Sequence, residues 1–341
     1  MRHFLTIFFS FLLMAAGCSV HEEGTGNSGT DSGYGDLVPQ DVVLHREFTE
    51  DFSTDVPEQI EFAYRTVRED FRYFPGVPSY TERNTDILMQ RIDPFDQAGA
   101  ERGSVVLSKD YTFYGTYSTR IRVPDIRTAQ PNVSALADFS VSYEDPSYGY
   151  NEIFIECRIA DPRILYLGTK TGIAPEQNTL SKIVNLADGT VYDASYSSVT
   201  VLNNGSSSAN FGGELSGAQN LPETFNALDG FDASSCFHVC GFDWYPDKII
   251  WWIQDPDTEE KTILWEYEGA DLFPGRPSST GIPVIPSKCR LAFWHSKISP
   301  VEGNSASVEA PFYPYELEVD RISYEPFDDL NNAWQEEHFN R

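Results

Sequence analysis

Basic residues are scarce in this chain of 341 residues. Only 24 lysines and arginines stand against 52 aspartates and glutamates, which gives a formal net charge of −28. Proteins that bind nucleic acid need patches of Lys and Arg to contact phosphates, so this balance argues against a nucleic-acid partner. It indicates instead a soluble, self-repelling monomer whose ligand is neutral or at least not acidic.

Cysteine is also rare, with five residues in the whole chain. Four of them lie beyond the N-terminal region and allow three disulfide pairings, between which the sequence does not choose. These four are Cys157, Cys236, Cys240 and Cys289. A zinc site is not indicated around His238, because a strand would turn it onto one face with its two cysteine neighbours and no second pair of ligands follows.

Helical periodicity is nearly absent after residue 36, and no internal repeat is found. The best helix candidate is the stretch 58–71, which could equally be irregular. Short β-rich runs separated by Gly, Pro and Asp predict an antiparallel sandwich or barrel. These runs are 86–92, 103–108, 115–123, 134–143, 150–159, 237–244, 248–253, 261–267, 288–294 and 315–324. The run 203–208 predicts a long loop, either functional or a disordered insertion.

The N-terminus has the pattern of a secretory signal. Arg2 and His3 precede an apolar run, 4–14, that is too short for a stable membrane span, and small residues follow. Those small residues lead into Cys18 and resemble a bacterial lipobox, which implies removal of residues 1–17 and acylation of Cys18. The alternative is an ordinary signal with an incidental cysteine.

Residues 18–36 are rich in Gly, Ser and Asp and predict a flexible tether. They resemble the tethers of surface-exported lipoproteins of Bacteroidetes-type bacteria. We therefore expect a protein that is lipid-anchored in the outer membrane and exposed at the cell surface, with a single domain over residues 37–341.

Two glutamates lie four residues apart in a strand-like run, 151–156. Residues two apart on a strand share a face, so Glu152, Phe154 and Glu156 point one way and Ile153 and Ile155 point into the core. Glycoside hydrolysis needs two carboxyl groups in different roles, but on a flat strand their Cα atoms lie about 13 Å apart. The sheet must therefore curve if both are to reach one bond. The alternative is an edge strand with two exposed acids.

Three segments, in this order, resemble family 16 glycoside hydrolases. They are an aromatic-Gly strand at 113–122, the Glu-Ile-Phe-Ile-Glu run at 152–156, and a Phe-His…Asp-Trp-Tyr-Pro hairpin at 237–252. The segments 291–294 and 318–324 resemble two later strands of the family. The resemblance covers about residues 40–327 and implies an all-β, concanavalin-like jelly-roll sandwich of two antiparallel sheets with a concave glycan cleft.

The resemblance also implies roles for individual residues. Glu152 matches the nucleophile and Glu156 the acid/base of a retaining reaction, which requires no cofactor. Phe154 replaces an Asp between them; it cannot hydrogen-bond the nucleophile and would raise the pKa of both carboxyls by desolvation. Tyr150 and Trp294 match aromatic positions that line the cleft, with rim packing as the alternative.

Other residues are expected to be structural. Asp320 matches a ligand of a structural calcium ion in some relatives, with a plain surface Asp as the alternative. The side chains of Trp244, Trp251 and Trp252 are expected to pack the sandwich, and those of His238 and His295 to be structural.

Three functions are compatible with these residues. The first is a retaining, endo-acting glycoside hydrolase acting on a β-linked polysaccharide, a glucan or galactan, at the bacterial surface. The second is a catalytically impaired glycan-binding lipoprotein on the same fold, because Phe154 replaces the Asp. A surface adhesion protein that binds no sugar is the third. Sugar and linkage depend on the loops that build the subsites.

Overall fold

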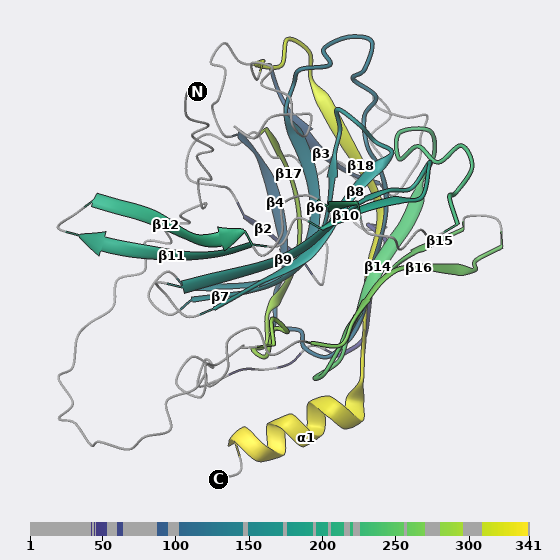
Figure 1. Cartoon of the computed structure of the whole chain (residues 1–341). Coiled ribbons are helices and arrows are strands. Elements are labelled where there is room, and N and C mark those ends of the chain that lie inside the picture. Colours follow the sequence, from purple (N-terminus) through teal and green to yellow (C-terminus); the bar gives the residue numbers. More distant parts are fainter. Residues whose placement is uncertain are drawn as a thin grey trace.

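The computed structural model describes residues 42, 44, 46–52, 60–63, 87–94, 102–145, 149–172, 176–193, 196–203, 206–214, 219–220, 226–255, 258–269, 280–295 and 309–339. Within these ranges the chain forms two antiparallel sheets and one helix (Figure 1). The expected all-β jelly-roll sandwich is confirmed. The signal segment, Cys18 and the tether lie outside the described residues. None of the helical structure within the described ranges is long and apolar enough to span a bilayer.

The smaller sheet has seven strands. Their order is β1 (Phe48–Glu50), β18 (Tyr315–Pro326), β5 (Gly115–Arg122), β14 (His238–Trp244), β15 (Ile249–Gln254) and β16 (Lys261–Tyr267), with β3 (Leu88–Ile92) also paired to β18. The hairpin of β14 and β15 is the one expected from the sequence.

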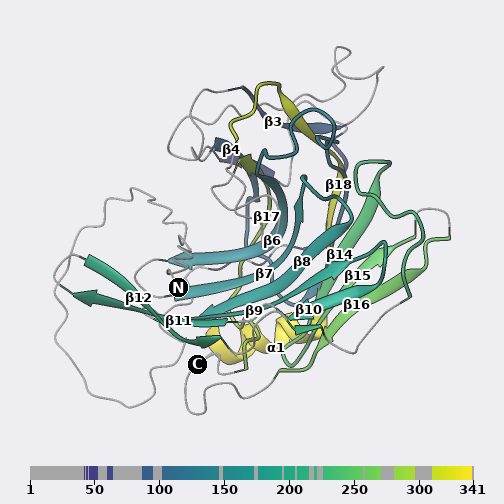
Figure 2. The same cartoon turned by 45° about the horizontal axis from the view of Figure 1, so that its top comes forward.

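The larger sheet has eleven strands and is curved (Figure 2). Its order is β12 (Ser206–Glu214), β11 (Tyr196–Asn203), β9 (Glu176–Asn185), β8 (Ile164–Gly172), β7 (Gly149–Arg158), β6 (Ala135–Asp145), β17 (Lys288–His295), β4 (Arg102–Ser108) and β2 (Ile60–Ala63). The short strand β10 (Thr190–Asp193) pairs with β9 and with β13 (Gln219–Asn220).

The core lies between the two sheets and is built by alternation along each strand. From the larger sheet, Ile153 and Ile155 point inward as predicted. From the smaller sheet, Trp244 and Trp251 meet them, and the Trp251 indole N–H donates to the carbonyl oxygen of Phe154 at 3.1 Å. This hydrogen bond ties the smaller sheet to the backbone of β7 and satisfies the one polar atom of a fully buried ring.

The adjacent tryptophans face opposite ways, as two neighbours on a strand must. Trp252 is buried outside the main core, donates to Asp243 and lies under the ammonium of Lys261, 3.7 Å from the ring centroid. The expected packing between the sheets is confirmed for Trp244 and Trp251, whereas Trp252 is buried outside the main core.

The two histidines are also structural, as expected. A ring nitrogen of His238 lies 3.0 Å from the carbonyl oxygen of Asp232, and burial lowers the pKa of this histidine. The buried ring of His295 makes the same kind of contact, at 2.9 Å, with the carbonyl oxygen of Glu309. The four described cysteines are all free thiols in this structure.

Two sequence predictions were wrong, and one helix was missed. Residues 60–63 of the helix candidate 58–71 form strand β2. The predicted loop at 203–208 belongs to the hairpin of β11 and β12, whose strands are separated by an Asn-Gly pair typical of tight turns. The C-terminal helix α1 (Asp328–Phe339) was missed; it begins with two acids that favour a helix N-terminus, and Trp334 packs against the core.

Candidate active site

The two predicted catalytic glutamates lie on the outer face of the larger sheet, by which we mean the face turned away from the smaller sheet. β7 is paired on both sides, by β6 and by β8, so the edge-strand alternative is wrong. The register pairs Glu152 with Ser142 and Lys170, Phe154 with Ser140 and Gly168, and Glu156 with Asp138 and Tyr166. β7, the strand that carries both glutamates, therefore lies in the middle of the curved sheet (Figure 2). The glycan cleft itself stays a prediction.

Glu152 is held between two cations. Its Oε2 atom lies 2.9 Å from Nζ of Lys170, and its Oε1 atom lies 3.6 Å from a guanidinium nitrogen of Arg290. Burial alone would lower the pKa of Lys170, but the charges of Glu152 and Glu156 outweigh it and raise that pKa well above its ordinary value. Lys170 therefore stays charged, and with it the ion pair that favours the carboxylate form of Glu152.

Phe154 is 4% exposed and lies on the outer face between the two glutamates. It packs with Tyr166 and Ile183 in a small apolar cluster separate from the main core. Its ring lies across Gly168, where a Cβ atom would come within 2.7 Å of the ring carbon Cζ. The ammonium of Lys170 lies 5.0 Å from the ring centroid, so Phe154 contributes a cation–π contact to the residue that binds Glu152.

Glu156 differs from Glu152 in its charge environment. Burial is the main cause that raises its pKa, from 4.5 to about 7. The charges of Asp138 and Glu152 raise it further, and those of Lys170 and Arg158 oppose them. A carboxyl group with a pKa near neutrality can both give and take a proton at pH 7, which is what a general acid/base requires.

Asp138, Lys170 and Arg290 complete this cluster, and sequence reasoning missed all three. Asp138 is 3% exposed, and its Oδ2 atom lies 2.8 Å from a guanidinium nitrogen of Arg290. Burial raises the pKa of Asp138, and the charge of Arg290 opposes that change. The only sequence signal was polar residues alternating with apolar ones along β6 and β17, which gives no register between strands.

The predicted aromatic positions differ in what they offer a sugar. Tyr150 is partly exposed on the outer face, two residues before Glu152. Trp294 is only 6% exposed, and the guanidinium of Arg290 lies over its ring at 5.2 Å. Arg290 covers one side of this ring because β17 places the two side chains on one face, four residues apart, and the stacking of a sugar on Trp294 stays a prediction.

Asp320, the predicted calcium ligand, is paired with a cation in this structure. Its carboxylate forms an ion pair with Arg120 at 3.0 Å on the smaller sheet, away from the glutamates. Across the described parts of the chain, no three His, Cys, Asp or Glu side chains group closely enough to hold a metal ion. Calcium also binds backbone carbonyl oxygens and water, so a structural calcium ion at Asp320 stays a prediction.

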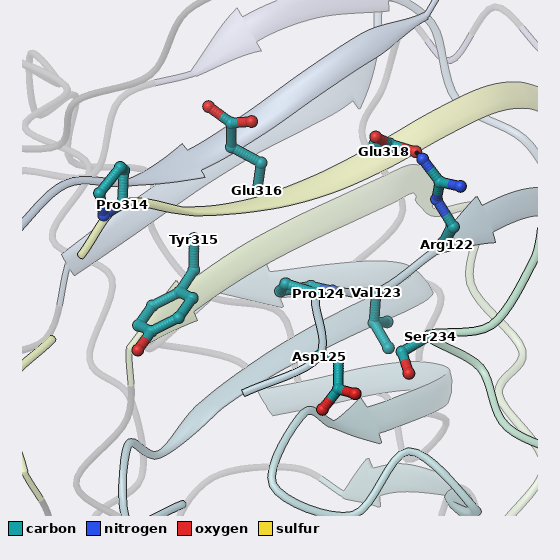
Figure 3. Close-up of a pocket in the computed structure, with 9 residues that line it drawn as sticks. All are labelled: Arg122, Val123, Pro124, Asp125, Ser234, Pro314, Tyr315, Glu316 and Glu318. Carbon is teal, nitrogen blue, oxygen red and sulfur yellow. Dashed lines mark ion pairs between the residues drawn. The ribbon is translucent and has the colours of Figure 1, made fainter. Parts of the chain in front are cut away.

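A pocket of about 390 Å³ lies elsewhere, at the ends of β5 and β18 (Figure 3). Tyr315 and the ion pair of Arg122 with Glu318 are among the residues that line it. None of the outer-face residues described above lines this pocket, so it is separate from the glutamate pair.

The chain was compared with known families, curated proteins and solved structures. No protein-family model matches the chain, and a search of curated proteins found no match either. Among solved structures, a β-1,3-1,4-glucanase (lichenase) from a mouse hindgut metagenome is similar at 15% identity and a TM-score of 0.48, with 83% of this chain and 100% of that one covered. The β-glucanase of Bacillus licheniformis matches at 15% identity and 0.44, with 82% and 98% covered.

The catalytic domain of an endo-1,3-β-glucanase (laminarinase) from Thermotoga petrophila matches at 15% identity and a TM-score of 0.45, with 85% of this chain and 100% of that one covered. By name, these proteins are glycoside hydrolases, the kind of enzyme that the sequence resemblance implied. At such identities and TM-scores they carry no argument about chemistry. The two sheets establish the fold of this chain, and its activity has to be argued from the side chains of the outer face.

Proposed function

We propose that the chain is a retaining glycoside hydrolase that cleaves a β-linked polysaccharide at internal bonds. One observation carries the proposal: Glu152 and Glu156 share a face of one central strand and have different charge environments. Glu152 is paired with Lys170 and Arg290, whereas the pKa of Glu156 is raised to about 7. Retaining hydrolysis needs this division, an ionised nucleophile beside a protonated acid.

The reaction follows from these two states. Glu156 donates its proton to the glycosidic oxygen while a carboxylate oxygen of Glu152 attacks the anomeric carbon, so the leaving sugar departs and a glycosyl ester forms on Glu152. Glu156, now ionised, takes a proton from a water molecule that displaces Glu152. Lys170 contacts Oε2, so we assign the attack to Oε1; the ammonium keeps Glu152 ionised before the glycosyl ester forms and again after water displaces it.

The test compares wild type with Glu152→Gln and Glu156→Gln on a panel of β-glucans and β-galactans. We expect release of reducing ends by wild type, with products of intermediate length, and a loss of about 100-fold or more in each variant. Asp320→Asn, the same kind of change on the other sheet, serves as the matched control and should keep wild-type activity. Equal activity in wild type and both glutamate variants would refute the proposal.

A second candidate is a glycan-binding protein without turnover. It is favoured by the 2.9 Å contact between Lys170 and Glu152, because an ion-paired carboxylate is a weaker nucleophile, and by Phe154 in place of an acid. Isothermal titration calorimetry with the same glycans separates the two. Binding without any product in wild type would support this candidate over the first.

We also propose that residues 1–17 are removed and that the protein is anchored through a lipid on Cys18 at the outer membrane, exposed to the outside. The support is the signal pattern and the Gly/Ser-rich tether of the sequence. Cys18→Ala should move the protein from the membrane fraction to the soluble fraction of its host. An unchanged distribution would refute the anchor.

A further inference from the structure

Asp138 faces the proposed proton donor directly. β6 and β7 are antiparallel, and their register sets Asp138 opposite Glu156 on the outer face. Side chains directly opposite on such strands have Cβ atoms about 4.5–5.5 Å apart, close enough for two carboxyl groups to share a proton. Asp138 is almost completely buried, so its interactions are made with the protein and not with bulk water.

The two oxygens of Asp138 are used differently. Oδ2 pairs with Arg290 at 2.8 Å, whereas Oδ1 is buried and accepts no hydrogen bond from any residue in the described ranges. A buried acceptor without a donor costs free energy, which a hydrogen bond from a protonated carboxyl opposite would remove.

Arg290 connects this aspartate to the nucleophile. Besides Asp138, it reaches Oε1 of Glu152 at 3.6 Å, and its guanidinium rests over the Trp294 ring at 5.2 Å. Its side chain is held on one flank by the indole and on another by two carboxylates. The same guanidinium nitrogen, Nη1, makes both contacts, so Arg290 bridges the two carboxylates.

None of the other groups described around Glu156 is placed to share a proton with it as Asp138 is. Along β7, Glu152 and Arg158 act on it with opposite charges, and from β8 the ammonium of Lys170 acts on it as well. Tyr166, opposite Glu156 on β8, is covered by the guanidinium of Arg158 at 3.9 Å.

We propose that Asp138 is a positioning residue that shares one proton with Glu156 and so keeps the proton donor protonated and oriented, with Arg290 holding Asp138 in place. When the proton passes to the glycosidic oxygen, Asp138 and Glu156 are both carboxylates, and their repulsion favours the return of a proton from water. The catalytic use of this pair rests on the proposed function. The sharing of the proton does not, and it can be tested separately.

The experiment titrates Glu156 by ¹³C NMR in the full chain labelled at the glutamate carboxyl carbon, with the signal assigned by its loss in Glu156→Gln. In Asp138→Asn we expect the midpoint to move from about pH 7 to lower pH, by about one pH unit or more, because a like charge has been removed. Asp320→Asn, the matched control, should leave the midpoint in place. An unchanged midpoint in folded Asp138→Asn would overturn the proposal.

Arg290→Lys provides the second variant in case Asp138→Asn does not fold. It keeps the charge but loses the two-sided contact, and we expect the Glu156 midpoint to move and its titration to broaden. If wild type turns over a glycan, Asp138→Asn should also shift the alkaline limb of the kcat/KM profile to lower pH, with KM unchanged. If wild type turns over none, the proposed function fails and the NMR midpoint alone decides the role of Asp138.

Discussion

Replacing Glu156 by Gln should stabilise the protein, and more so as the pH rises. In the folded state the carboxyl has a pKa of about 7 against an ordinary value of 4.5, chiefly because of burial. At pH values between 4.5 and about 7, the folded protein therefore keeps the Glu156 proton, whereas the unfolded chain has already released it. Over this interval wild type loses stability as the pH rises, and above about pH 7 the loss is complete.

The size of the effect follows from the two pKa values. Their difference, about 7 minus 4.5, is about 2.5 pH units. At about 1.4 kcal/mol for each unit, the full loss is about 3.5 kcal/mol. This is an upper value because the side chain is partly exposed and solvent screens its charge. Gln has nearly the same shape and no charge, so the variant escapes the loss.

Urea unfolding at pH 5 and pH 8, followed by tryptophan fluorescence, measures the effect. We expect the difference in free energy of unfolding between Glu156→Gln and wild type to grow by about 2 kcal/mol or more in favour of the variant from pH 5 to pH 8. Asp320→Asn should show no such gain, because that carboxylate is partly exposed and ion-paired on the other sheet. A difference between Glu156→Gln and wild type that is the same at both pH values would refute the reasoning.

Three further changes test the surroundings of the pair. Lys170→Met removes the cation 2.9 Å from Glu152 and should destabilise the fold by about 1–3 kcal/mol in chemical denaturation at pH 7. When Glu152 is already replaced by Gln, the same change should cost half as much or less, because no carboxylate is left unpaired. Additive losses in the double variant would contradict the coupling. Gly168→Ala places a Cβ 2.2 Å from the Leu180 carbonyl oxygen and 2.7 Å from Phe154, and should cost about 1–3 kcal/mol; an unchanged melting temperature would contradict the packing. Trp251→Phe removes the 3.1 Å hydrogen bond to the Phe154 carbonyl and should lower the free energy of unfolding in urea by about 1–3 kcal/mol. A loss below about 0.5 kcal/mol would contradict the role of this bond.

Local alternation was enough to find the strands that define the site. β7 and the hairpin of β14 and β15 were predicted to within about two residues, because their inward positions carry large apolar side chains and their turns carry Pro, Asp and Gly. The inward direction of Ile153 and Ile155 followed from the same alternation.

Other elements have no such signal. β8 and β9 carry apolar residues on the outer face, where Tyr166 and Ile183 pack with Phe154, so their alternation is weak. The helix α1 has few apolar residues and depends on Trp334 packing against a core that the sequence does not show.

The partners of the two glutamates could not be predicted for a different reason. Asp138, Lys170 and Arg290 lie on three strands other than β7, and they meet the glutamates only through the register of the sheet. Sequence predicts which face of a strand a residue occupies, but not which residue of another strand lies opposite.

The central claim is that Glu152 and Glu156 act as a retaining pair. Proton NMR of the first sugar ends released from a β-linked polysaccharide tests it most directly, because the anomeric signal is read before mutarotation. Retention predicts a β-anomer as the first product and its later conversion to the equilibrium mixture. An α-anomer as the first product would contradict the account.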